Sequence, residues 1–227
     1  MKTLRNPLLF LIVLSSMTAC FRSPLQLARD GVSTYDIVVP SDADSLILHA
    51  AEELKHYILL SSGADMPITL EENREPDRQA LYVGFHPDTT NLEAHTIGYL
   101  VEDEDLFIYG GNSKSTLYAV YRFLERELGC MWLSPDAEKV PATTRLAIDP
   151  GTSYSYTPEI ETRTVHSRLF YENHAFADKL GVTYEGFPGY VPGHGVHTFH
   201  RFLPEAVHYE DHPEYYALRG DKRLTTQ

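Results

Sequence analysis

Short β-rich runs alternate with two amphipathic helical patterns over residues 31–150, and this alternation restricts the folds open to the chain. The first helical pattern is carried by apolar residues spaced three and four apart: Ile47, Ala50, Ala51, Leu54, Tyr57 and Ile58. Gly63 ends that pattern. We expect Ser41 to cap its start, with Asp42 and Asp44 in the first turn, where the helix dipole favours them.

The second helical pattern follows Gly110-Gly111-Asn112, which is typical of a strand-to-helix turn and lacks the glycine-lysine step of a phosphate-binding loop. Asn112 or Ser113 is expected to cap the helix, and Gly129 to occupy its C′ position. Its apolar face consists of Leu117, Val120, Tyr121, Leu124 and Leu128.

Strands are predicted around these helices at 35–39, 68–70, 80–84, 97–101, 106–109, 131–133 and 146–148. The acidic run Glu102–Asp105 lies between two of them and indicates a solvated hairpin turn rather than a metal site. Two helices among short strands predict an α+β fold, in which a mixed β-sheet is covered by two helices.

Composition excludes several classes of protein. A net charge of −13 and a pI near 5.2 argue against nucleic acid as a partner. Two cysteines cannot build a disulfide scaffold or a four-cysteine zinc motif. At 227 residues the chain is also shorter than the roughly 250 residues of a complete (β/α)8 barrel.

Residues 1–19 are predicted to be a signal peptide. Lys2 and Arg5 precede the apolar run Leu8–Leu14, which is too short to span a bilayer. The ending Met17–Cys20 resembles a bacterial lipobox, which implies that Cys20 is lipidated and begins the mature chain; an ordinary signal cleaved near Ala19 is the alternative.

The lipobox interpretation implies an exported protein, anchored by lipid only, in the cell envelope of a Gram-negative bacterium. Phe21, where an inner-membrane protein would carry Asp, favours the outer membrane. Residues 20–30 are then expected to form a tether. The remaining Cys130 lies in an apolar run and is predicted to be a buried thiol.

Beyond Pro150 the chain becomes richer in aromatic residues and histidine. Residues 151–227 hold 8 of the 15 Tyr, 5 of the 10 Phe and 7 of the 11 His. A Gly- and Pro-rich loop spans 186–195, and aromatic loops of this kind are typical of ligand-binding faces. Aromatic rings, imidazoles and carboxylates together suit a carbohydrate ligand.

Two stretches carry a family resemblance: Leu117–Glu125, and Leu128-Gly129-Cys130-Met131-Trp132 with Pro135. They resemble the small non-catalytic domain that precedes the barrel in α-glucuronidases and family 20 β-hexosaminidases (hexosaminidase domain 2). His212–Leu218 and Gly220–Arg223 resemble an uncharacterised family of exported bacterial lipoproteins that join this domain to a glycosidase-type barrel.

The resemblance implies that residues 31–150 form this N-terminal domain and that 151–227 are the incomplete start of a (β/α)8 barrel. The first barrel strand is expected at Ile160–Arg168. Members of the family continue well beyond position 227, so the chain is expected to be an N-terminal fragment whose catalytic carboxylates lie past Gln227.

Four residues are predicted to contact substrate: Arg163, His194, His197 and Tyr216. Arg163 stands where the related enzymes hold sugar hydroxyls with an arginine at the end of the first barrel strand. His194, His197 and His200 are spaced by three, but the sequence has no HExxH helix, so no metal and no cofactor is expected.

Two functional hypotheses follow. The first is a glycoside hydrolase-like, glycan-processing lipoprotein acting on O-glycosyl bonds in polysaccharide. The second is a non-catalytic carbohydrate-binding envelope lipoprotein. A purely structural role stays open, because no residue within 31–150 marks a site.

Overall fold

The computed structural model of the protein describes residues 23–87, 92–183 and 198–224. Two units can be separated in it, Met1–Val182 and Thr183–Gln227. Within the described ranges, no helix combines the length and the apolar character needed to cross a bilayer.

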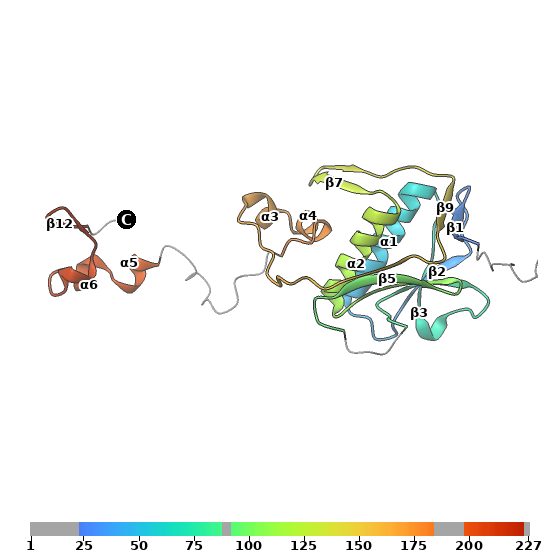
Figure 1. Ribbon diagram of the computed structural model, residues 1–227, viewed down its shortest axis with the longest axis horizontal. Helices are drawn as coiled ribbons and strands as arrows, with labels where there is room; N and C mark the ends of the chain where they lie inside the picture. The colour runs from blue at the N-terminus through green and yellow to red at the C-terminus, as the bar shows by residue number, and fades with distance from the viewer. Residues whose placement is uncertain (1–22, 88–91, 184–197, 225–227) are drawn as a thin grey trace, which may run out of the picture. The chain divides into compact units, whose positions relative to one another are not determined.

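The first unit is built on a six-stranded sheet with the strand order β10-β5-β6-β4-β2-β3 (Figure 1). Its strands are β2 (Tyr35–Val39), β3 (Ile68–Leu70), β4 (Gln79–Val83), β5 (Ile97–Glu102), β6 (Asp105–Gly110) and β10 (Ser153–Tyr156). Along the part of the sheet ordered β6-β4-β2-β3, each strand is parallel to its neighbour. Strand β5 is antiparallel to both β6 and β10. The predicted mixed sheet is confirmed, and β10 extends it past residue 150.

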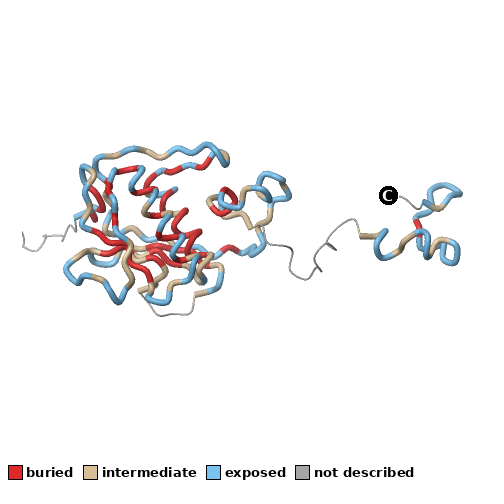
Figure 2. Tube along the Cα trace, turned by 180° about the vertical axis from the view of Figure 1, so that it is seen from behind, coloured by how far each residue is buried: buried red, intermediate tan, exposed pale blue. Residues whose placement is uncertain are grey.

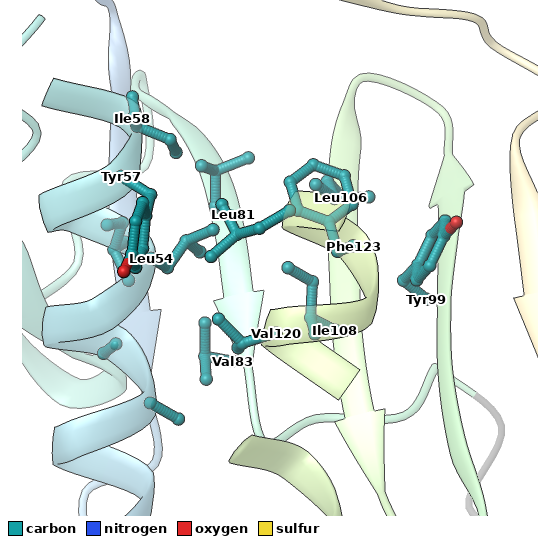
Figure 3. Close-up of a cluster of buried hydrophobic side chains, with 14 of the residues drawn as sticks. Leu54, Tyr57, Ile58, Leu81, Val83, Tyr99, Leu106, Ile108, Val120 and Phe123 are labelled. Atoms are coloured by element: carbon teal, nitrogen blue, oxygen red, sulfur yellow. The ribbon is translucent and has the colours of Figure 1, made fainter. Parts of the chain in front are cut away.

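Helices α1 (Ser45–Ser62) and α2 (Ser113–Glu127) lie on one face of this sheet (Figure 1). Every apolar residue predicted to line their inner faces is buried. Between helices and sheet these side chains meet strand residues such as Leu81, Leu106 and Ile108 (Figure 3). Burial of apolar surface in this layer is the main term that stabilises the unit.

The helix ends follow local rules, with one correction. Asp44, not Ser41, caps α1: its Oδ1 accepts hydrogen bonds from the N–H groups of Leu46 and Ile47, each at 2.9 Å. The Ser113 hydroxyl donates to Asp44 Oδ2 at 2.6 Å, and this bond, followed by the backbone bonds, lowers the pKa of Asp44. One carboxylate thereby joins the starts of α1 and α2.

The other predicted termini are confirmed. Asn112 caps α2, since its side chain accepts from the Ser115 N–H at 2.8 Å. Gly63 and Gly129 adopt positive φ values of 74° and 73° after the two helices. In the turn before α2, a Cβ on Gly110 would collide with the backbone of Ser115 and Thr116, so only glycine fits there.

A second correction concerns the expected tether at 20–30. Residues Leu25–Arg29 form strand β1, which pairs antiparallel with β9 (Arg145–Ile148), and Leu25 lies opposite Ile148. Leu27 is fully buried in the main core. The strand forms because alternate apolar side chains reach the core while the backbone is paired by β9, a partner far away in sequence.

Another small sheet consists of β7 (Met131–Ser134) and β8 (Ala137–Lys139), which form a hairpin after α2. Trp132 points inward and is 8% exposed, whereas Met131 and Leu133 are largely exposed. Cys130, just before β7, is fully buried, as predicted. Burial, and secondarily the charge of Glu138, raises the pKa of its thiol to about 11.

The strand predicted at Ile160–Arg168 is wrong. This stretch is irregular, and the helices α3 (Arg168–Glu172) and α4 (His174–Lys179) follow it. Ile160 is 69% exposed. A lone extended segment leaves its backbone groups unpaired, and no named strand of the described chain pairs with this one.

The second unit contains short elements: α5 (Phe199–Phe202), α6 (Glu205–His208), a 3₁₀ turn η3 (Pro213–Tyr215), and the strands β11 (Leu218–Arg219) and β12 (Lys222–Arg223). The two strands pair as a hairpin. Most of its described residues are exposed, whereas the sheet and helices of the first unit are rich in buried positions (Figure 2).

Candidate functional site

A cavity of about 190 Å³ lies in the first unit between α2, the end of α4 and the irregular segment after β10. We call it the Arg163 cleft. Its walls combine three tyrosines, three cations and two carboxylates: Tyr118, Tyr121, Tyr156, Arg122, Arg163, Lys179, Glu125 and Asp178. It is the candidate site because it gathers convergent aromatic and charged groups. A larger depression beside β1 is lined without a cation.

Helix α2 supplies one wall. Tyr118, Tyr121, Arg122 and Glu125 recur at three- and four-residue spacings, so they form a stripe along the edge of its buried face. Arg122 forms an ion pair with Glu125 through one terminal nitrogen. Its Nε is buried, and no described residue accepts a hydrogen bond from it.

Helix α4 closes the opposite side and is fixed by two ion pairs. Asp178 is 8% exposed and receives Lys114 Nζ of α2 at 2.6 Å. Lys179 Nζ lies 3.5 Å from Glu138 Oε2 of β8. Phe176, 6% exposed, joins the main core. Ion pairs and apolar packing together hold this short helix against α2, β8 and the main core.

Arg163 fixes the third wall. Its Nε donates to the Gly181 carbonyl, and one terminal nitrogen donates to the carbonyls of Ile160 and Glu161, all at 3.2 Å. The guanidinium carbon also lies 5.8 Å from the centre of the Tyr118 ring, within range of a cation–π interaction. Much of this arginine's bonding capacity therefore joins the segment after β10 to the end of α4.

Two buried tyrosine hydroxyls of α1 and α2 donate to carboxylates. Tyr121 donates to Glu53 Oε2 at 2.9 Å, and Tyr57 donates to Glu138 Oε2 at 2.6 Å. Burial is the largest cause that raises the pKa of both phenols, and the adjacent carboxylates raise it further. Both hydroxyls stay protonated near neutral pH and act as fixed donors, and of the two Tyr121 lines the cleft.

The predicted site residues fall in three places. Arg163 lines the cleft, although as a clamp for backbone carbonyls rather than at the end of a strand. Tyr216 belongs to the second unit, where it is 1% exposed and donates to the Leu203 carbonyl at 3.1 Å. His194, His197 and the lipidation candidate Cys20 lie outside the described residues. Their predicted roles stay predictions.

Tyr216 is the centre of a small aromatic cluster. The ring centres of Phe199 and Tyr209 lie 5.8 and 5.2 Å from that of Tyr216. Arg223 donates to the Tyr216 carbonyl at 2.8 Å, which fastens the β11–β12 hairpin to this cluster. In the structure this tyrosine holds the second unit together.

Sequence reasoning missed the α2 wall. The helical pattern assigns Tyr121 to the core and does not single out Tyr118, Arg122 or Glu125. Their common helical stripe, at the border between the apolar and polar faces, was the available signal. Among the described residues, no group of His, Cys, Asp or Glu is arranged to hold a metal ion.

Residues 132–227 match the family described as a domain of unknown function, DUF4838. The matched range is less than half of the chain. No curated protein sequence matches the chain.

Several solved structures resemble the chain distantly. A mutant β-hexosaminidase from Streptomyces plicatus, in complex with the product GlcNAc, is 16% identical, with a TM-score of 0.42. The GH20 β-N-acetylhexosaminidase from Streptomyces coelicolor A3(2) is also 16% identical, with a TM-score of 0.43. Each match covers 63% of this chain and 25% of the other.

A GH115 4-O-methyl-α-glucuronidase with specificity for decorated arabinogalactans is 14% identical, with a TM-score of 0.44; the match covers 63% of this chain and 19% of the enzyme. The chain thus spans a quarter or less of the length of these three structures. The low TM-scores describe a distant structural resemblance to glycoside hydrolases and no more.

Proposed function

We propose that this chain is part of a glycan-processing protein and that its described residues contribute a carbohydrate-binding site, the Arg163 cleft. The observation that carries the proposal is the convergence of three tyrosines with cations and carboxylates on one small cavity. Sugar rings present apolar C–H faces to aromatic rings, and their hydroxyls require both donors and acceptors. The cleft supplies each of these.

The size and charge of the cleft restrict the ligands that it can bind. Its volume of about 190 Å³ is below the roughly 300–1,000 Å³ of sites for drug-sized molecules, which suits a single sugar ring. Three cations face two carboxylates there, although the whole chain carries a net charge of −13. Arg122 lines the cleft, and its guanidinium carries N–H donors beyond the one that contacts Glu125.

Binding rather than hydrolysis fits the described residues. Glu125 is paired with Arg122, and Asp178 with Lys114, whereas a glycosidase needs one carboxyl group that keeps its proton and a second that acts as nucleophile or base. We therefore place the catalytic carboxylates of the proposed hydrolase outside the Arg163 cleft. Turnover of uronic-acid and N-acetylhexosamine glycosides by the full reading frame would test that part of the proposal.

Isothermal titration with a panel of monosaccharides tests the cleft directly. We expect Arg122→Gln to weaken binding by about tenfold or more, because a hydrogen bond to a charged donor contributes roughly 1.5–3 kcal/mol. Arg145→Gln, at an exposed position of β9 and outside the cleft, is the matched control and should bind like the wild type. If the wild type binds no saccharide, the assignment of the cleft is wrong.

Export and lipid attachment are the second part of the proposal, supported by the sequence of residues 1–20. Fatty-acid labelling in a Gram-negative host should mark the wild type but not Cys20→Ala. Unlabelled wild-type protein with an intact signal sequence would contradict this part, and it would leave the cleft unaffected.

A further inference from the structure

A second cavity, of about 360 Å³, shares the lining residue Lys179 with the Arg163 cleft. We call it the Trp132 cavity. It is formed by the β7–β8 hairpin and by the junction of α3 with α4, and its main lining residues are Trp132, Asp136, Glu138, Ala175, Phe176 and Lys179. None of the functions discussed so far uses this cavity.

The aromatic wall of the Trp132 cavity is rigidly held. Trp132 Nε1 donates to the Tyr57 hydroxyl at 2.9 Å, and the indole packs edge-to-face against Tyr57 and Tyr121, with ring centres 5.6 and 5.4 Å away. A ring fixed from behind in this way needs no ordering when a ligand reaches its accessible part. Preorganisation of this kind favours binding because little side-chain entropy is lost.

Lys179 connects the two cavities, because its side chain lines both of them. Its Nζ lies 5.4 Å from the centre of the Tyr57 ring and 3.5 Å from Glu138 Oε2, so the ammonium is held in place from two sides. Tyr121, which lines the Arg163 cleft, packs against Trp132 of the other cavity. One lysine and one aromatic contact therefore separate the two spaces.

The two cavities differ in charge. The Arg163 cleft is lined by more cations than carboxylates, whereas the Trp132 cavity has the three carboxylates Asp136, Glu138 and Glu172 beside Lys179 and His174. Carboxylates accept hydrogen bonds from paired hydroxyls. A carboxylate rim beside an indole wall is therefore suited to a neutral sugar ring with neighbouring hydroxyl groups.

We propose that the Trp132 cavity is a second subsite and that the ligand is an oligosaccharide of at least two units, whose linkage crosses Lys179. This inference rests on the proposed carbohydrate binding in the Arg163 cleft. It adds the class of ligand: a chain with a neutral sugar in the Trp132 cavity, rather than a free monosaccharide.

Calorimetry with matched mono- and oligosaccharides tests the second subsite. We expect an oligosaccharide to bind at least about tenfold more tightly than its own monosaccharide. Ala175→Trp fills the Trp132 cavity from an exposed position of α4 and should abolish that gain without changing monosaccharide affinity. Leu169→Trp, exposed on α3 and outside the lining, is the matched control and should keep the gain.

The outcomes separate the two proposals. Monosaccharide binding with no gain for the oligosaccharide overturns the second subsite and leaves the Arg163 cleft in place. A gain that persists in folded Ala175→Trp overturns it as well. If Ala175→Trp does not melt cooperatively, Asp136→Ala on the exposed rim replaces it, with the same expected loss of the gain. Absence of binding by every saccharide overturns both proposals.

Discussion

The sheet-and-helix layer, residues 25–156, and the later stretch, residues 157–224, bury their aromatic residues to different extents. In the layer, Tyr57, Tyr99 and Tyr121 are at most 2% exposed, and each donates its hydroxyl to a glutamate. In the later stretch, aromatic residues are denser in sequence, yet Phe202 is 64% exposed. Aromatic density alone therefore does not indicate a core: in this stretch Tyr216 and Phe176 are buried, whereas Phe202 and Tyr215 are exposed.

The largest expected effect is a difference in stability between alanine substitutions at two phenylalanines, one in each region. Phe123→Ala empties a fully buried position between α2 and the sheet and should lower the free energy of unfolding by about 3–5 kcal/mol. Phe202→Ala, in the second unit, should change it by roughly 0.5 kcal/mol or less. Urea denaturation followed by circular dichroism measures both. Equal losses would contradict the contrast.

A smaller effect is expected where the two regions meet within the first unit. Lys114→Met leaves the nearly buried Asp178 carboxylate without its 2.6 Å ion pair and should cost about 1–3 kcal/mol. Hydrogen exchange should also become faster in α4. Arg168→Met breaks a pair in which Arg168 is 87% exposed, so its cost should be about 0–0.5 kcal/mol. Unchanged exchange in α4 after Lys114→Met would show that the ion pair does not hold the helix.

Alkaline pH should reveal how far the burial of Tyr35 contributes to the stability of the layer. Burial, and then Asp105 and Glu104, raises the pKa of Tyr35 to about 12 from an ordinary value of 10.0. A raised pKa means that the folded state favours the protonated phenol, so stability is full below pH 10 and falls as the pH rises towards 12. Thermal melts across this range should show a shallower fall for Tyr35→Phe than for the wild type.

The smallest expected effect concerns the reactivity of the Cys130 thiol rather than the stability of the protein. Because burial raises the pKa of the Cys130 thiol to about 11, little thiolate exists at pH 8. In a Cys20→Ser background, iodoacetamide should therefore label Cys130 only after denaturation. In a parallel sample, Ala175→Cys, at an exposed position of α4, should react in the folded protein. Rapid native labelling of Cys130 would show that its pocket opens.

Local patterns in the sequence predicted α1, α2 and the β5–β6 hairpin, because helical spacing and turn residues act over a few positions. Gly63 and Gly129 end their helices for the same local reason. Strand β1 was mistaken for a tether because its partner, β9, lies more than a hundred residues away. The expected strand at 160–168 failed for the converse reason: its sequence suits a strand, but none of the named strands pairs with it.

The Arg163 cleft could be predicted only in part. Arg163 was singled out from a resemblance, yet its bonds to the Ile160, Glu161 and Gly181 carbonyls depend on how the chain returns towards α2. The wall from Tyr118 to Glu125 is regular in sequence, but its position facing α4 is set by the Lys114–Asp178 ion pair. Tertiary contacts of this kind leave no local pattern.

The pairing of β1 with β9 also sets the order in which the first unit can be completed. Leu25 is made early, but its partner Ile148 emerges only after both large helices and most of the sheet have been synthesised. Until then the apolar side chains of β1 have no paired strand beside them. The pairing of β1 with β9 is therefore among the last contacts that a growing chain can make in this unit.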